Sequence, residues 1–185
     1  MAEAENPARK GFTVWMTGLP GAGKSTVAGI LKRRLEEENG KFVEILDGDE
    51  IRKGLSRDLG LSRQDREEHA RRVSYLAKVL SRNGVVSIVA LISPYRVSRE
   101  SAKENIGADR FVEVYIKASL ATCEKRDPKG LYAKARKNEI TNLTGIQDPY
   151  EEPLAPDIVV DTEHSSAEKS ADEVLVGLRR LRLIG

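Results

Sequence analysis

The chain alternates between short apolar runs and longer segments that are richer in polar and charged residues. The apolar runs predict strands at residues 13–17, 42–46, 85–91, 111–117 and 158–160. Four of these five runs are apolar without interruption or nearly so, which is typical of strands that are covered on both faces. The pattern therefore predicts a sheet in the interior of the molecule, with other elements packed on each side.

The segments between these runs predict helices at residues 25–38, 49–55, 63–82, 96–106, 120–126 and 166–181. In segment 63–82, helical spacing of apolar residues predicts a buried face made of Ala70, Val73, Leu76, Ala77 and Leu80. Short strands separated by helices require right-handed crossovers, so we expect an α/β fold with a five-stranded parallel sheet and helices on both faces. Ligands of such sheets bind beyond the carboxyl ends of the strands.

The residues after the first predicted strand match the phosphate-binding pattern G-x-x-x-x-G-K-[ST] at every fixed position. They are Gly18, Leu19, Pro20, Gly21, Ala22, Gly23, Lys24, Ser25 and Thr26. A strand precedes them and a helix follows, which is the setting that this motif requires. The glycines let backbone N–H groups approach phosphate oxygens, while Lys24 neutralises the phosphates and the Ser25 hydroxyl is placed to bind Mg²⁺. We therefore expect a three-layer P-loop NTPase/kinase fold that binds a nucleoside triphosphate with Mg²⁺.

Two carboxylates and an arginine follow the second predicted strand, at Asp47, Asp49 and Arg52. One carboxylate could accept the proton of an attacking hydroxyl, one could orient Mg²⁺, and Arg52 could hold an anionic acceptor. An aspartate before a helix also commonly caps it. Both roles can coexist in one residue, and Gly48 between the two acids favours close approach of a ligand.

Composition and charge bound the function further. The 185 residues favour one domain, residues 11–185, after a flexible N-terminal segment 1–10. The net charge of +2 and an aromatic content of 5% give no indication of a nucleic-acid partner. No apolar run approaches the ~18 residues of a membrane span. The single cysteine, Cys123, suits the reducing cytoplasm and is expected to serve packing.

Several further segments, taken in order, resemble the adenylylsulfate kinase family over residues 11–162. They are residues 46–49, 51–55, 65–68, 92–96, 126–132 and 144–151. The family phosphorylates the 3′-hydroxyl of adenosine 5′-phosphosulfate with ATP. The resemblance implies that Lys24 and Ser25 hold the ATP phosphates and Mg²⁺, with Asp47 as a second metal ligand. It also implies that Asp49 orients or deprotonates the acceptor hydroxyl.

The remaining roles implied by the resemblance concern the acceptor and a mobile lid at residues 127–150. Arg52 and Arg66 would grip the phosphosulfate, and the lid residues Lys129, Gly130 and Leu131 would contact the substrate. Arg126 and Arg136 would help to cover ATP. Ser93 matches a serine that is described in the family as a phosphoserine intermediate. In-line transfer of a phosphoryl group needs positioning of the two substrates and no covalent enzyme intermediate. We therefore favour the alternative that Ser93 lines the acceptor pocket together with Pro94.

Three positions depart from the family pattern, all on the acceptor side. Leu61 and Leu143 stand where the family has two Phe residues that sandwich the adenine, and stacking is worth ~1–3 kcal/mol per contact. His69 replaces an Asn that binds substrate. Its imidazole also offers a donor and an acceptor, and its proton titrates near physiological pH. We expect weaker binding of adenylylsulfate than in relatives with both Phe residues, and an affinity that varies with pH through His69.

Other functions stay open because these departures concern the acceptor alone. The main alternative is a P-loop kinase for another anionic nucleotide or small metabolite, since Arg52, Arg66 and Lys129 favour an anion. A nucleotide-dependent switch module is a second alternative, although the chain has no guanine-binding Asn-Lys-x-Asp motif. A degenerate regulatory homologue is a third. The resemblance further implies a homodimer.

Overall fold

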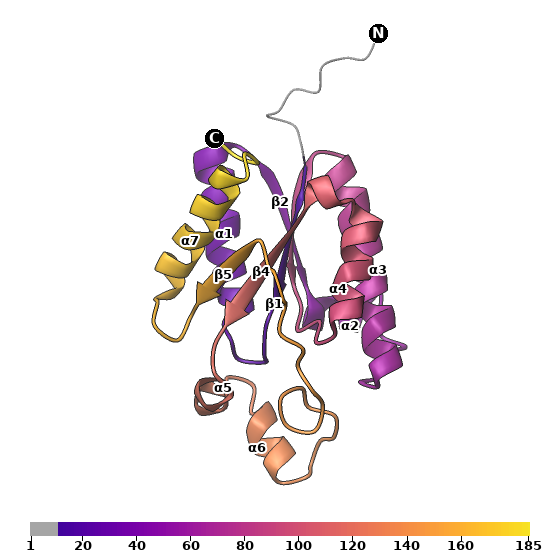
Figure 1. Cartoon of the computed structure of the whole chain (residues 1–185). Coiled ribbons are helices and arrows are strands. Elements are labelled where there is room, and N and C mark those ends of the chain that lie inside the picture. Colours follow the sequence, from indigo (N-terminus) through magenta and orange to yellow (C-terminus); the bar gives the residue numbers. More distant parts are fainter. Residues whose placement is uncertain (1–10) are drawn as a thin grey trace.

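The computed structural model describes residues 11–185, which contain one parallel sheet in the order β2-β3-β1-β4-β5 (Figure 1). The strands are β1 (Thr13–Thr17), β2 (Phe42–Asp47), β3 (Val85–Ala90), β4 (Phe111–Lys117) and β5 (Ile158–Asp161). Every pair of neighbouring strands is parallel. The predicted sheet is confirmed, with strand ends that differ by at most one residue from the expected ones. The predicted flexible segment 1–10 lies outside the described residues.

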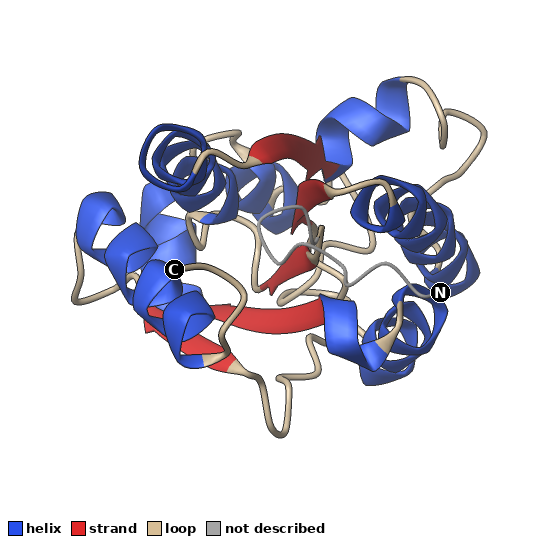
Figure 2. Cartoon of the chain, turned by 90° about the horizontal axis from the view of Figure 1, so that it is seen from above, coloured by secondary structure: helices blue, strands red, loops and turns tan. Residues whose placement is uncertain are grey.

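Helices cover both faces of this sheet, as Figure 2 shows from above. α1 (Lys24–Asn39) and α7 (Ala167–Arg180) pack together on one face. α3 (Arg63–Arg82) and α4 (Arg96–Ile106) pack together on the other. The predicted three-layer α/β fold is therefore confirmed. No helix within residues 11–185 is both long and apolar enough to cross a bilayer.

Successive residues of β1 pack into different layers, which explains why Val14, Trp15 and Met16 in the first predicted strand are apolar without alternation. Val14 and Met16 belong to the core beneath α1 and α7, and Trp15 belongs to the core beneath α3 and α4. All three side chains are fully buried. Cys123 is buried in the first of these cores, consistent with its expected packing role.

Three short helices lie beyond the carboxyl edge of the sheet: α2 (Gly48–Lys53) follows β2, α5 (Leu120–Arg126) follows β4, and α6 (Leu131–Arg136) follows α5. A 3₁₀ turn (Ala108–Arg110) precedes β4. The sequence pattern predicts neither this turn nor α6. α6 is only six residues long, and its first N–H groups are capped from a distance by the Asp127 carboxylate, which accepts from Tyr132 N at 3.2 Å and Ala133 N at 3.0 Å.

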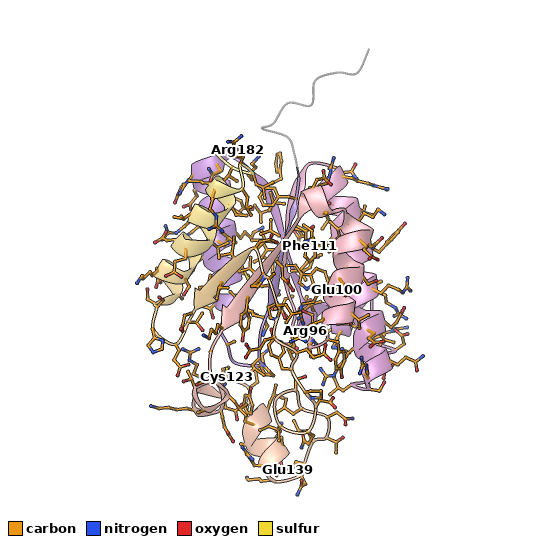
Figure 3. All side chains as sticks on the ribbon, in the orientation of Figure 1. Arg96, Glu100, Phe111, Cys123, Glu139 and Arg182 are labelled. Atoms are coloured by element: carbon orange, nitrogen blue, oxygen red, sulfur yellow. The ribbon has the colours of Figure 1, made fainter. Side chains whose placement is uncertain are left out.

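The predicted lid, residues 127–150, contains α6 and lies beyond the carboxyl edge of the sheet, at the bottom of Figure 1. Figure 3 labels Glu139 at the tip of this segment and Arg182 at the opposite end of the molecule. The lid therefore stands next to the strand ends where a ligand of a parallel sheet is expected.

Candidate active site

Most of the predicted site residues line one cavity of about 730 Å³ at the carboxyl ends of β1, β2 and β3. The phosphate loop, the start of α2, the loop after β3 and the lid all contribute to its wall. The predicted residues among its lining are Pro20, Gly21, Gly23, Lys24, Ser25, Thr26, Asp47, Asp49, Arg52, Leu61, Arg66, His69, Ser93, Pro94, Arg126, Lys129, Leu131 and Leu143. Residues that are far apart in the sequence thus meet where the sheet predicts a ligand.

Five predicted residues are not part of the lining: Gly18, Leu19, Ala22, Gly130 and Arg136. Gly18 is needed for close approach, since a Cβ there would lie 2.4 Å from the Ile116 carbonyl oxygen. Arg136 was expected to cover ATP, but its guanidinium makes a two-pronged contact with Glu124 of α5 at 2.7 and 3.1 Å. Because α6 turns its first residues toward the cavity, Arg136 at its last position lies on the outside of the lid.

The phosphate loop presents backbone donors and a buried ammonium group. Gly21 and Gly23 have φ of +77° and +99°, a region that glycine adopts without steric cost. Gly23 is the N-cap of α1, so the unpaired N–H groups and the dipole of that helix favour an anion at the loop. Lys24 Nζ donates to the carbonyl oxygens of Gly18 and Leu19, both at 2.8 Å. Burial lowers the pKa of Lys24 to about 8.

Asp47 caps α2 and also contacts Ser25 of the phosphate loop. Its Oδ1 accepts from Asp49 N at 3.0 Å and caps α2, while its Oδ2 accepts from Ser25 Oγ at 2.6 Å. Partial burial raises the pKa of Asp47, but the hydrogen bonds from Ser25 and from the N–H groups of Asp49 and Glu50 outweigh it, so the pKa lies below its ordinary value.

The Ser25 and Asp47 oxygens are hard ligands beside the phosphate loop, which suits Mg²⁺. In the described part of the chain, no three His, Cys, Asp or Glu side chains converge on one point. A magnesium ion here would therefore take its other ligands from phosphate oxygens and water, as Mg²⁺ usually does.

Two basic residues connect the predicted lid to the rest of the cavity wall, Lys129 of the lid and Arg66 of α3. Lys129 forms an ion pair with Asp49. The guanidinium of Arg66 is buried and bridges two backbone segments: Nε donates to the Leu61 carbonyl at 3.0 Å and Nη2 to the Asn142 carbonyl at 2.6 Å. Arg66 thus fixes the backbone at Leu61 and next to Leu143, the two positions of the expected adenine sandwich.

Ser93 lines the cavity, but its hydroxyl is engaged from the core. Ser93 Oγ accepts a hydrogen bond from Trp15 Nε1 at 3.2 Å. The backbone of Ser93 has a φ of +37°, a left-handed conformation that costs energy for a residue with a side chain. This arrangement supports a role in shaping the pocket and offers no base to activate the hydroxyl as a nucleophile.

The pKa of His69 differs from the value that the sequence leads us to expect. Burial, together with the neighbouring guanidinium groups of Arg52 and Arg72, lowers the pKa of His69 to about 4. Neither ring nitrogen has a hydrogen-bond partner within the described residues, although the side chain is 95% buried and lines the cavity. A pKa of about 4 leaves His69 neutral at physiological pH and therefore does not support the expected change of affinity through its titration in that range.

Two further residues shape the site and were not predicted. The Tyr132 hydroxyl donates to the Pro20 carbonyl at 3.0 Å and fastens α6 to the phosphate loop. Thr162, after β5, donates to the Ala22 carbonyl at 2.7 Å and accepts from Arg126 at 3.3 Å. The sequence signal for Thr162 is its position directly after the last strand, since ligands of parallel sheets bind beyond the carboxyl ends of the strands.

A family model described as adenylylsulphate kinase matches residues 10–161. The chain belongs to the adenylylsulfate kinase family. One relative, the adenylyl-sulfate kinase of Halothermothrix orenii, is 52% identical over 167 residues, which are 90% of this chain and 89% of that protein. The match extends over the phosphate loop, the acceptor side and the lid together.

Solved structures of adenylylsulfate (APS) kinases have the same fold. The APS kinase of Mycobacterium tuberculosis in complex with AMPPNP and APS has a TM-score of 0.87 at 45% identity, covering 92% of this chain and 98% of that one. The hexameric APS kinase from Thiobacillus denitrificans has a TM-score of 0.72 at 32% identity, covering 96% of this chain but only 30% of that one. The second comparison shows that this fold also occurs within longer chains.

We predict that ATP binding is linked to the titration of Lys24. Since the pKa of Lys24 is about 8 in the free protein and phosphate oxygens favour the ammonium form, binding should take up a proton near pH 8 and none near pH 6.5. Calorimetric titration with Mg·ATP in two buffers of different ionisation enthalpy measures this uptake. The Lys24→Arg variant, whose guanidinium stays charged, should show none. Equal heats in both buffers near pH 8 for the wild type would contradict the prediction.

We also predict that His69 stays neutral down to about pH 5, because its pKa is about 4. The chain has only two histidines, so imidazole NMR signals can be assigned with a His69→Asn variant. The signal lost in this variant should not titrate above about pH 5. The unfolded chain binds this proton more readily, so the wild type should also lose stability relative to His69→Asn as the pH falls from about 6.5 to 4. A His69 signal that titrates near pH 6.5 would overturn both expectations.

Proposed function

We propose that this chain is an adenylylsulfate kinase that transfers the γ-phosphoryl group of ATP to the 3′-hydroxyl of APS. The observation that carries the proposal is that a single cavity contains the groups for both substrates. It is lined by the phosphate loop with Lys24 and by Asp49, Arg52 and Lys129 on the acceptor side. Family membership and a relative solved with AMPPNP and APS support the same pair of substrates.

On the donor side, the loop N–H groups and Lys24 hold the phosphates of ATP. Lys24 then exchanges its two carbonyl partners in the loop for phosphate oxygens, which raises its pKa and keeps it charged near pH 8 as well. Ser25 and Asp47 would hold Mg²⁺, which when bound neutralises charge on the β- and γ-phosphates. Arg126, fixed by Thr162, lines the cavity beside the loop and can cover the nucleotide.

On the acceptor side, Asp49 is placed to accept the proton of the 3′-hydroxyl or to orient it for in-line attack. The ion pair with Lys129 has to open as the acceptor enters. The freed ammonium can then bind the phosphosulfate together with Arg52. Ser93 has no covalent role in this scheme, since its hydroxyl serves as the acceptor for Trp15.

The adenine of the acceptor would lie between Leu61 and Leu143, whose backbones Arg66 holds. The neutral ring of His69, which lacks a partner within residues 11–185, would donate and accept hydrogen bonds to this substrate. A buried polar group without a partner costs free energy. A substrate that forms hydrogen bonds with both ring nitrogens of His69 should therefore bind more tightly than one that does not.

A homodimer and a cytoplasmic location remain part of the proposal. A hexameric relative supports assembly of this fold, and the free thiol of Cys123 is compatible with a reducing compartment. The main competing function is a kinase for another anionic acceptor, because Arg52 and Lys129 would favour any anion. A nucleotide switch is distinguished by turnover that needs no acceptor.

We predict that ADP release from Mg·ATP depends on APS, and that Asp49→Ala lowers the APS-dependent rate by about 10²-fold or more. A coupled assay with and without APS measures both effects. Glu50→Ala is the matched control, since this neighbouring carboxylate pairs with Lys53 outside the cavity. Turnover that is indifferent to APS would overturn the acceptor assignment while leaving the ATP site in place.

We predict that Leu61→Phe tightens APS binding about tenfold, because a partly exposed leucine is replaced by a ring that stacks on adenine. Leu143 is already buried in the core, so Leu143→Phe should gain less, since added volume there strains the packing. Calorimetric titration with APS in the presence of Mg·ADP gives the dissociation constants. Leu154→Phe, at an exposed position outside the cavity, is the control. An unchanged dissociation constant for Leu61→Phe would refute the stacking argument.

A further inference from the structure

Arg99 of α4 lies outside the cavity lining but joins three segments on which the cavity depends. Its side chain is almost fully buried, with 3% exposed. Nε donates to Glu113 Oε1, Nη1 to the Ser93 carbonyl and Nη2 to the Glu151 carbonyl, each at 2.7 Å. A guanidinium presents its donors in a fixed planar fork, so one side chain can hold three acceptors in a set geometry. The flexible ammonium of a lysine cannot.

The three acceptors belong to the sheet, to the cavity wall and to the segment after the lid. Glu113 lies in β4, inside the sheet, and its carboxylate neutralises the buried guanidinium. Ser93 follows β3 and lines the acceptor side of the cavity. Glu151 comes directly after the lid. Arg99 therefore ties the acceptor wall and the C-terminal end of the lid to the sheet.

Further hydrogen bonds reinforce this junction. Glu151 N donates to the Pro94 carbonyl at 2.8 Å, and Arg96 N donates to the Glu151 carboxylate at 2.8 Å. The hydroxyls of Tyr150 and Thr17 are 2.9 Å apart, which links the end of the lid to the end of β1. Figure 3 labels Arg96 at the end of α4 that faces the lid segment. The lid is thus attached on this side by backbone and buried contacts.

The contact at the start of the lid is weaker. Lys129 reaches Asp49 through an ion pair whose side chains are 58% and 63% exposed, and exposed pairs contribute little to stability. Opening of the lid would therefore begin at Lys129, would also break the hydrogen bonds of Tyr132 to Pro20 and of Arg66 to Asn142, and would pivot about the attached end at Glu151. The backbone of Ser93 stands at this pivot in its left-handed conformation, which persists only where surrounding contacts hold it.

We infer that Arg99 is a positioning residue that fixes the acceptor wall at Ser93 to the pivot of the lid at Glu151. This inference rests on the proposed function, because it assigns the consequence to binding of APS. The phosphate loop makes none of these contacts, so ATP binding should be largely independent of Arg99. Loss of the three-way contact should loosen the acceptor side alone.

The test compares Arg99→Lys with the wild type in the APS-dependent assay. The lysine keeps a cation beside Glu113 but cannot hold all three acceptors, so KM for APS should rise about tenfold and kcat should fall, while KM for ATP changes less than about twofold. Glu113→Gln keeps the oxygen that accepts from Nε and should retain KM for APS closer to wild type. Arg34→Lys, which makes the same change at the ion pair with Asp172 between α1 and α7, is the control for an arginine-to-lysine substitution elsewhere. Two results would contradict the inference and show that Arg99 only stabilises the fold. One is a lower Tm of Arg99→Lys with KM for APS and KM for ATP both unchanged, and the other is an equal rise of both KM values.

Hydrogen exchange separates this inference from the proposed function. With Mg·ADP bound, Arg99→Lys should exchange faster than wild type at residues 142–152 and equally at residues 18–26. If the wild type did not phosphorylate APS, the proposed function would fail, yet the exchange difference would still test the pivot. Unchanged exchange at residues 142–152 would refute the role of Arg99 whatever the acceptor is.

Discussion

The parallel register of β1, β2 and β3 is the constraint on which the active site depends. Ala90 at the end of β3 pairs with Asp47 of β2 on one side and with Met16 of β1 on the other. The phosphate loop, Asp47 and Ser93 therefore leave the sheet at the same level. A slip by one residue would turn Val14 and Trp15 toward the wrong layers, which the two cores forbid. The geometry of the cavity is thus a consequence of core packing.

Within this frame, the cations of the cavity are all held by oxygens of the protein itself. Lys24 binds carbonyls of its own loop, Lys129 binds Asp49, and Arg66 binds carbonyls that flank the acceptor slot. Under the proposed function, substrate oxygens replace the partners of Lys24 and Lys129, so both ammonium groups keep a partner throughout binding, while Arg66 keeps its carbonyl partners. The exchange at Lys129 couples binding to the lid, because Lys129 belongs to it.

The strands, the phosphate loop and the acidic pair after β2 could be predicted because their signals are local: apolar runs, a fixed spacing, and a position after a strand. The pKa of His69 could not, since it depends on burial and on Arg52 and Arg72, which come near only in the folded chain. The contact between the Ser93 hydroxyl and Trp15 is likewise tertiary, since the partners are 78 positions apart in the sequence. α6 was not predicted for a different reason: it has only six residues, and its cap comes from Asp127 and not from its N-cap residue Gly130.

The two sides of the cavity also differ in how they can vary. On the donor side, the groups that meet phosphate are backbone N–H groups at Gly21 and Gly23, whose positive φ excludes most side chains, so a change of residue there destroys the loop. On the acceptor side, recognition depends on side chains such as Leu61 and His69, while Arg66 and Arg99 hold the backbone behind them. Because buried arginines hold the backbone in place, the side chains that face the cavity can change without moving it. Under the proposed function, this division accounts for the departures from the family pattern at Leu61, Leu143 and His69, which alter the acceptor side and leave the phosphate loop unchanged.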